Sequence, residues 1–122
     1  MDLIIDGYNL MHKAVFKNGT LEEKRERIIS IVEEFCEVNS NRAVIVFDAA
    51  GTESNMRSKE KRKNIKLVFS AKGESADDAI ADIITRKNPK KYIVVTSDRY
   101  IRDIALNLRF NIMKSEELAQ YF

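Results

Sequence analysis

Residues 3–9 read Leu-Ile-Ile-Asp-Gly-Tyr-Asn, an apolar run that stops at a carboxylate followed by glycine. Consecutive large aliphatic residues without polar alternation are typical of a strand covered on both faces, as in a parallel sheet. Asp6 would then lie at the carboxyl end of a central strand, which is the edge where open α/β sheets bind their ligands. The stretch therefore predicts an α/β fold with its chemistry at that edge.

Two later apolar runs end in the same way. Residues 43–47 are followed by Asp48, and residues 92–97 are followed by Asp98. A single aspartate after a strand is ordinary, because aspartate begins turns and caps helices, and either role alone would explain Asp48 or Asp98. Three aspartates that follow three apolar strands indicate a site.

The rest of the chain alternates between strand and helix patterns. Further strands are expected at 65–69 and 111–113, and helices are expected at 8–15, from 20 to about 39, from 75, at 98–109 and from 115. This alternation predicts an α/β/α sandwich of three layers around a parallel sheet of about five strands. With the strand order 3-2-1-4-5, Asp6 and Asp98 lie on neighbouring strands and Asp48 lies one strand away.

The helix that begins near Ser75 adds a fourth carboxylate. On a helical wheel, Asp77 aligns with the apolar side that contains Ile84, whereas Asp78 aligns with Asp82 on the solvent side. Asp77 is therefore expected to point toward the sheet edge and to join the strand-end aspartates.

Such a cluster favours a divalent metal ion. Packed carboxylates repel one another unless a cation lies between them, and Mg²⁺ and Mn²⁺ prefer oxygen ligands. One or two such ions can activate water against a phosphodiester bond. Asn9, Thr96 and Ser97 are expected either to support the carboxylates by hydrogen bonds or simply to satisfy backbone groups. The single histidine, His12, excludes a mechanism of RNA cleavage that needs two histidines, and it is expected on the surface of the first helix.

Basic residues are concentrated in one short segment, although the formal net charge of the chain is only +2. Six of the 21 basic residues and one of the 19 acidic residues lie between Met56 and Lys66. The six are Arg57, Lys59, Lys61, Arg62, Lys63 and Lys66. The segment is either a solvated loop or a surface that neutralises the phosphates of RNA held against the acidic cluster.

Length and composition limit the remaining possibilities. A chain of 122 residues with 44% hydrophobic residues is expected to form a single domain over residues 1–122. No apolar run approaches the ~20 residues that cross a bilayer, and the chain enters a strand at once, so neither a membrane partner nor a signal peptide is expected. The single cysteine, Cys36, excludes an internal disulfide and suits the reducing cytoplasm. The sequence leaves the oligomeric state open.

Four motifs, taken in order, resemble those of a known family. They are residues 5–9 (Ile-Asp-Gly-Tyr-Asn), 46–49 (Val-Phe-Asp-Ala), 73–78 (Gly-Glu-Ser-Ala-Asp-Asp) and 95–98 (Val-Thr-Ser-Asp). Together they resemble the NYN domain family, and the chain looks most like its YacP-like branch, within the PIN-like nucleases. The resemblance covers nearly the whole chain.

The resemblance implies a PIN-like fold and a metal-dependent endoribonuclease that uses Mg²⁺ or Mn²⁺. Carried over by motif, the catalytic metal-site acids would be Asp6, Asp77 and Asp98, with Asp48 and Asp78 as auxiliary ligands and Asn9 in support. The resemblance also implies RNA as the substrate and the translating ribosome as a candidate partner in RNA decay.

Two alternatives to a nuclease stay open. One is a catalytically weak RNA-binding module of PIN-like fold, against which the retained aspartates argue. The other is a small-molecule phosphohydrolase of similar topology. Such an enzyme would want a second aspartate two positions after Asp6, where the chain has Tyr8.

Overall fold

The computed structural model describes residues 1–14, 18–49 and 51–122, and the statements below concern these residues. Its elements are β1 (Asp2–Asp6), α1 (Gly7–Lys13), α2 (Leu21–Asn39), β2 (Ala43–Phe47), β3 (Ser58–Arg62), β4 (Ile65–Phe69), α3 (Ala76–Ile84), β5 (Tyr92–Val95), α4 (Arg99–Asn107), β6 (Asn111–Met113) and α5 (Ser115–Ala119). Every element expected from the sequence is present. The expected end of the first helix, Val15, lies outside the described residues.

The strands form one sheet in the order β3-β4-β2-β1-β5-β6. The five strands expected from the sequence pair in parallel, which confirms the predicted order. No strand was expected in the basic segment, and that expectation was wrong. Strand β3 forms there and pairs antiparallel with β4. The sheet therefore has six strands, with the basic segment on its open edge.

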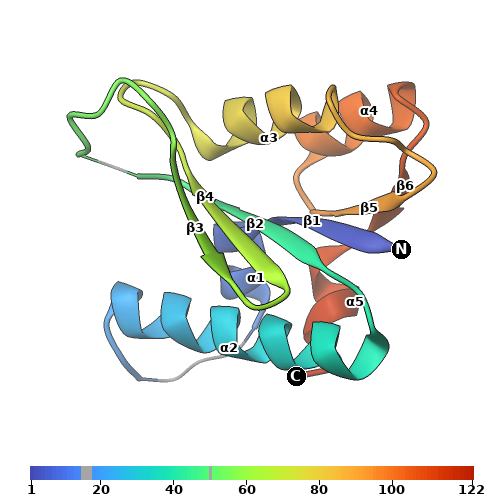
Figure 1. Ribbon diagram of the computed structural model, residues 1–122, viewed down its shortest axis with the longest axis horizontal. Helices are drawn as coiled ribbons and strands as arrows, with labels where there is room; N and C mark the ends of the chain where they lie inside the picture. The colour runs from blue at the N-terminus through green and yellow to red at the C-terminus, as the bar shows by residue number, and fades with distance from the viewer. Residues whose placement is uncertain (15–17, 50) are drawn as a thin grey trace.

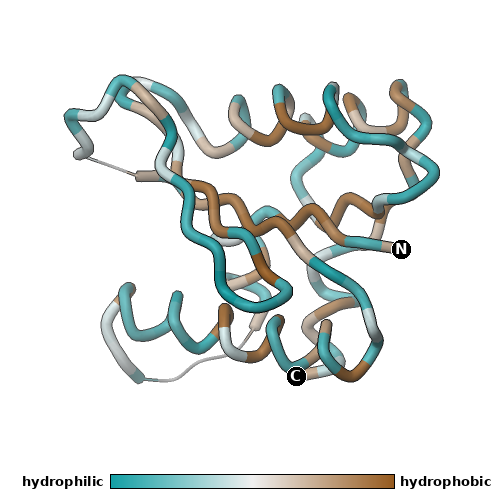
Figure 2. The backbone as a smooth tube through the Cα atoms, in the orientation of Figure 1, coloured by the Kyte–Doolittle hydropathy of each residue, from teal (hydrophilic) through white to brown (hydrophobic). Residues whose placement is uncertain are grey.

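Helices cover both faces of the sheet, with α3 and α4 on one face and α1, α2 and α5 on the other (Figure 1). Alternate residues of each parallel strand divide between two cores, so Ile5 packs toward α1 and α2 while Ile4 packs toward α3 and α4. Figure 2 shows the apolar strands between the helices and the hydrophilic course of β3. Burial on both faces explains why β1 and β2 are continuous apolar runs.

Side-chain caps fix where two of the helices begin. The Thr20 hydroxyl accepts from the Glu23 backbone N at 3.1 Å, and the Glu23 carboxylate accepts from the Thr20 N at 3.1 Å, which is the capping box that the sequence predicted. The Ser75 hydroxyl accepts from the Asp78 N at 3.1 Å and so begins α3 beside the sheet edge. None of the helices in the described ranges is long and apolar enough to span a bilayer.

Gly7 stands where a side chain would collide with the core. A Cβ at this position would lie 2.5 Å from Cε1 and 2.6 Å from Cδ1 of Phe47, which is fully buried. The Phe47 ring has no room to turn away, because it packs edge-on against Tyr8 and stacks on Phe69. The absence of a Cβ at Gly7 therefore lets α1 begin directly after Asp6.

We expect Gly7→Ala to lower the free energy of unfolding by about 1–3 kcal/mol, even though alanine is the better helix former, because the added methyl overpacks the core. Denaturant unfolding measures this loss. Phe47→Leu removes ring atoms that the methyl would meet, so the double variant should lose less than the sum of the two single variants. Additive losses would contradict the collision.

Candidate functional site

The predicted aspartates gather where the parallel strands end. Asp6, Asp48, Asp77 and Asp98 line one cavity of about 260 Å³. Asp6 is the last residue of β1, Asp48 follows β2 and Asp98 follows β5, and Asp77 lies in the first turn of α3. The cavity is also lined by Tyr8, Asn9, His12, Ser75 and Ala76. The crossover helix thus meets the strand ends as the wheel predicted.

Asp6 is the most buried of these carboxylates, with only 6% of its surface exposed. It caps α1 by accepting from the Asn9 backbone N at 3.4 Å, and its other oxygen accepts from the Thr96 hydroxyl at 3.3 Å. Burial raises the pKa of Asp6 to about 6, although the Asn9 N–H lowers it, and the charges of Asp77 and Asp98 raise it further. A buried carboxylate with this pKa marks a functional candidate.

Asp77 and Asp78 differ in placement although they are adjacent. Asp77 is half-buried and lines the cavity, whereas Asp78 is exposed and does not. Burial raises the pKa of Asp77, and the nearby charges of Asp98, Asp78 and Asp48 raise it too. Asp78 therefore acts on the cavity through its charge, from outside the lining.

Thr96 connects the Asp6 carboxylate to the backbone of Asp98. Its hydroxyl donates to Asp6 and accepts from the Asp98 backbone N at 3.0 Å. Asp98 in turn accepts from the Ile101 N at 3.1 Å and so caps α4. Asp98 therefore caps a helix with one oxygen and also lines the cavity.

Asn9 and Ser97 tie α5 to the site. The Asn9 side-chain oxygen accepts from the Ser97 backbone N at 2.8 Å and from the Ser115 hydroxyl at 2.6 Å. The Ser97 hydroxyl accepts from the Ser115 N at 3.0 Å and donates to the Glu116 carboxylate. Ser115 and Glu116 were not expected beside Asn9 and Ser97, because no local pattern in the sequence places residues of α5 beside α1.

The chemistry of the cavity suits a hard divalent cation. Neither Asp6 nor Asp48, Asp77 or Asp98 forms a salt bridge with any side chain in the described ranges, so their mutual repulsion has no basic partner. As they stand, no three Asp, Glu, His or Cys side chains of those ranges are close enough together to hold a metal ion. Carboxylate oxygens are the ligands that Mg²⁺ and Mn²⁺ prefer, so the residues that would hold such an ion are the aspartates of the cavity.

None of the six basic residues predicted to bind RNA lines the acidic cavity. Arg57 makes a bidentate ion pair with Glu74 at 2.6 and 2.9 Å and contacts Asp82 at 2.8 Å, and this pairing lowers the pKa of Glu74. Arg62 pairs with Glu26 and Glu60. In the part of the chain that the structure describes, Lys59, Lys61, Lys63 and Lys66 form no salt bridge.

Comparison with known proteins identifies the family of the chain. The model of the YacP-like NYN domain matches residues 3–122. The chain belongs to the YacP-like NYN domain family. This is a family of PIN-like nucleases.

Members of the YacP-like NYN family from Bacillus subtilis resemble the chain in sequence and in fold. The uncharacterized protein YacP of strain 168 is 28% identical over 102 residues, which are 79% of this chain and 59% of that protein. The crystal structure of Rae1 (YacP) superposes with a TM-score of 0.74 at 23% identity, covering 99% of this chain and 72% of that one. Its W164L mutant gives a TM-score of 0.77 at 24% identity, covering 99% and 74%. These matches show that the fold is PIN-like.

Proposed function

We propose that this chain is a metal-dependent endoribonuclease that hydrolyses RNA phosphodiester bonds at the acidic cavity. The observation that carries the proposal is the convergence of Asp6, Asp48, Asp77 and Asp98 on one cavity without a basic partner in the described ranges. Membership of a PIN-like nuclease family supports it.

In this mechanism Asp6, Asp77 and Asp98 are the catalytic ligands of Mg²⁺ or Mn²⁺. One or two bound ions would supply an activated water and would stabilise the leaving oxygen of the phosphodiester. Asp48 also lines the cavity and is an auxiliary ligand in this proposal, and Asp78 contributes negative charge from outside. Thr96 orients Asp6 and the backbone of Asp98, so it fixes the geometry of two ligands at once.

The RNA substrate must approach a negatively charged cavity, so cations are needed elsewhere along the path of the RNA. We assign this role to Lys59, Lys61, Lys63 and Lys66, which form no salt bridge in the described ranges. Arg57 and Arg62 were predicted to bind RNA as well. Their ion pairs with Asp82 of α3 and Glu26 of α2 instead favour a role in fixing the β3–β4 hairpin against these two helices.

The decisive experiment is cleavage of a circular single-stranded RNA, which only an endonuclease can open. With Mn²⁺ or Mg²⁺ we expect linear products, and with EDTA we expect none. Asp6→Asn protein purified in parallel controls for contaminating nucleases. RNA binding without cleavage in any of these metals would instead support the catalytically weak binding module.

We further propose that the protein acts in the cytoplasm on RNA at the translating ribosome. The proposal rests on the resemblance of the YacP-like branch to ribosome-associated RNA decay factors. Cosedimentation of the chain with ribosomes in a sucrose gradient tests it. A chain that stays at the top of the gradient at low salt would count against this partner.

A further inference from the structure

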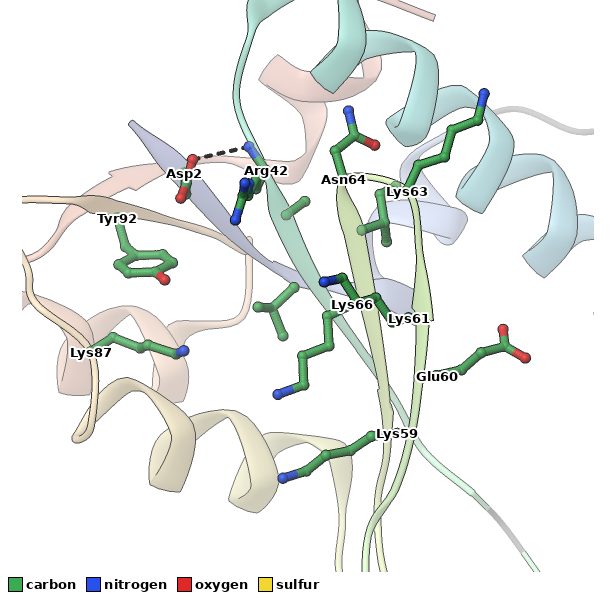
Figure 3. Close-up of a pocket in the computed structure, with 13 residues that line it drawn as sticks. Asp2, Arg42, Lys59, Glu60, Lys61, Lys63, Asn64, Lys66, Lys87 and Tyr92 are labelled. Carbon is green, nitrogen blue, oxygen red and sulfur yellow. Dashed lines mark hydrogen bonds between the residues drawn. The ribbon is translucent and has the colours of Figure 1, made fainter.

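A second and larger cavity lies at the opposite end of the sheet from the aspartates. It has a volume of about 480 Å³ and opens where β1, β2, β4 and β5 begin. The β3–β4 hairpin forms one wall, and Lys87 and Tyr92, which follow α3, form the other (Figure 3). Neither Lys87 nor Tyr92 was singled out by the sequence analysis.

Strand register directs three lysines to one side of the hairpin. Lys61 pairs with Lys66 and Lys59 pairs with Val68, so all three lysines share the sheet face that carries α3. Figure 3 shows the amines of Lys59, Lys66 and Lys87 extending into the same space. The cavity is therefore lined by several cations that approach it from two walls.

The two acidic residues at this cavity do not neutralise it. The Asp2 carboxylate accepts from the Arg42 backbone N at 3.0 Å at the rim. Glu60 points to the other side of the hairpin, where it pairs with Arg62 at 2.6 Å. The Lys87 amine lies 5.3 Å from the centre of the Tyr92 ring, which is a weak contact for an ammonium group.

The basic cavity continues along α3 toward the aspartates. A narrower cavity of about 120 Å³ shares Val44, Lys59, Lys66 and Lys87 with the larger one and adds Arg57, Val68, Ile83 and Arg86. We call the two together the basic groove. Arg57 at its far end pairs with Glu74, which immediately precedes Ser75 of the acidic cavity. The groove and the acidic cavity therefore lie toward the two ends of α3.

The shape of this charge fits a chain of phosphates better than a single phosphate. The amines come from two strands and from the segment after α3, so they are spread along the groove and do not converge on one point. A strand of five residues spans roughly 15 Å, which sets the separation of the groove from the aspartates. Single-stranded RNA combines repeating charge with bases that stack on aromatic rings such as Tyr92.

We propose that the basic groove holds the part of a single-stranded RNA that lies beyond the cleaved bond, with the RNA running along α3 from the acidic cavity to Lys87. This rests on the proposed nuclease function. Lys59, Lys66 and Lys87 contact phosphates, and Tyr92 offers a face to a base.

RNA affinity provides the test. The groove variant is Lys59→Gln/Lys66→Gln/Lys87→Gln, and the matched control is Lys24→Gln/Lys90→Gln/Lys114→Gln, whose lysines line neither cavity of the groove. Binding of a long fluorescent single-stranded RNA of about 16 nucleotides is measured in EDTA at several salt concentrations. We expect the groove variant to bind the long RNA at least roughly tenfold more weakly, with a log–log salt slope lower by about 2, because each lost contact contributes ~0.7.

The control should bind the long RNA like the wild type. Equal affinity of the groove variant and the control for the long RNA would overturn the proposal. Polyglutamate that binds as tightly as the long RNA would assign the groove to an acidic protein instead. Thermal unfolding of all three proteins checks that the groove variant folds.

Because binding is measured without metal, the result does not depend on cleavage. A protein that binds long RNA through the groove but never cleaves RNA would contradict the proposed nuclease function and support the RNA-binding groove. A protein that cleaves circular RNA, with a groove variant that binds like the control, would support the nuclease function and contradict the groove.

Discussion

Asp6→Asn protein is expected to lose metal-dependent RNA cleavage by at least about a hundredfold while keeping its fold. The amide has nearly the volume of the carboxylate, and asparagine is an equally good cap for α1. The Thr96 hydroxyl, which donates to Asp6 in the native protein, has a lone pair left to accept from the amide. Only the negative charge that a divalent ion requires is removed.

The measurement is the rate of circular-RNA cleavage in Mn²⁺, with circular dichroism as the check on folding. Asp103→Asn is the matched control, because Asp103 is an exposed aspartate on α4 outside the cavity. We expect this control to cleave like the wild type. A folded Asp6→Asn protein with wild-type activity would show that the chemistry does not involve the cavity.

The same substitution should change how stability depends on pH. Burial raises the pKa of Asp6 from 3.8 to about 6, so the folded state binds the proton more tightly than the unfolded state. Between these two values the free energy of unfolding of the metal-free protein should therefore fall as pH rises, by up to about 3 kcal/mol. Asp6→Asn removes this contribution.

Denaturant unfolding in EDTA at pH 4 and pH 7 measures the effect. We expect the wild type to lose more stability than Asp6→Asn over that interval, and the variant to be the more stable protein at pH 7. Identical losses in the two proteins would show that Asp6 titrates as it does in the unfolded chain.

The second large effect separates two neighbouring aspartates. We expect Asp77→Asn to lower the cleavage rate at least about a hundredfold, and Asp78→Asn to lower it less than about tenfold, because only Asp77 lines the cavity. The two changes are chemically identical and both lie in the first turn of α3, so each removes a similar favourable interaction with the helix dipole. Each variant thus controls for the effect of the other on the helix.

Steady-state cleavage at saturating Mn²⁺ measures the two rates. Raising the Mn²⁺ concentration should restore part of the Asp78→Asn loss, since that residue contributes distant charge, but little of the Asp77→Asn loss. Equal losses that persist at high Mn²⁺ would mean that both side chains reach the metal and that the cavity is wider than its lining indicates.

The parallel part of the sheet and its acidic edge could be predicted because the signals are local. Each buried strand is an unbroken apolar run, and each run ends in an aspartate, so the strand order alone brings Asp6, Asp48 and Asp98 together. The placement of Asp77 follows from helical period. These patterns need no knowledge of distant contacts.

What the sequence could not predict depends on pairing between distant residues. Ser58–Arg62 is charged and has low strand propensity, so β3 forms because it pairs with β4 and not because of its own preference. The hairpin turns at Lys63, where φ is +40°, and a lysine at such a position does not signal a turn as glycine or asparagine would. The ion pair of Arg57 with Glu74 likewise joins residues whose partnership no local pattern indicates.

The position of β3 at the open edge of the sheet limits how its sequence can change. An unpaired strand edge is a template on which a second copy can add its own strand, and lysines along an edge strand prevent this by repulsion. Lys59 and Lys61 are therefore subject to selection against aggregation even in cells that contain no suitable RNA. Substitution of either lysine by valine or isoleucine would raise strand propensity and remove charge at the same time, so drift along this strand is expected to favour other charged residues over apolar ones.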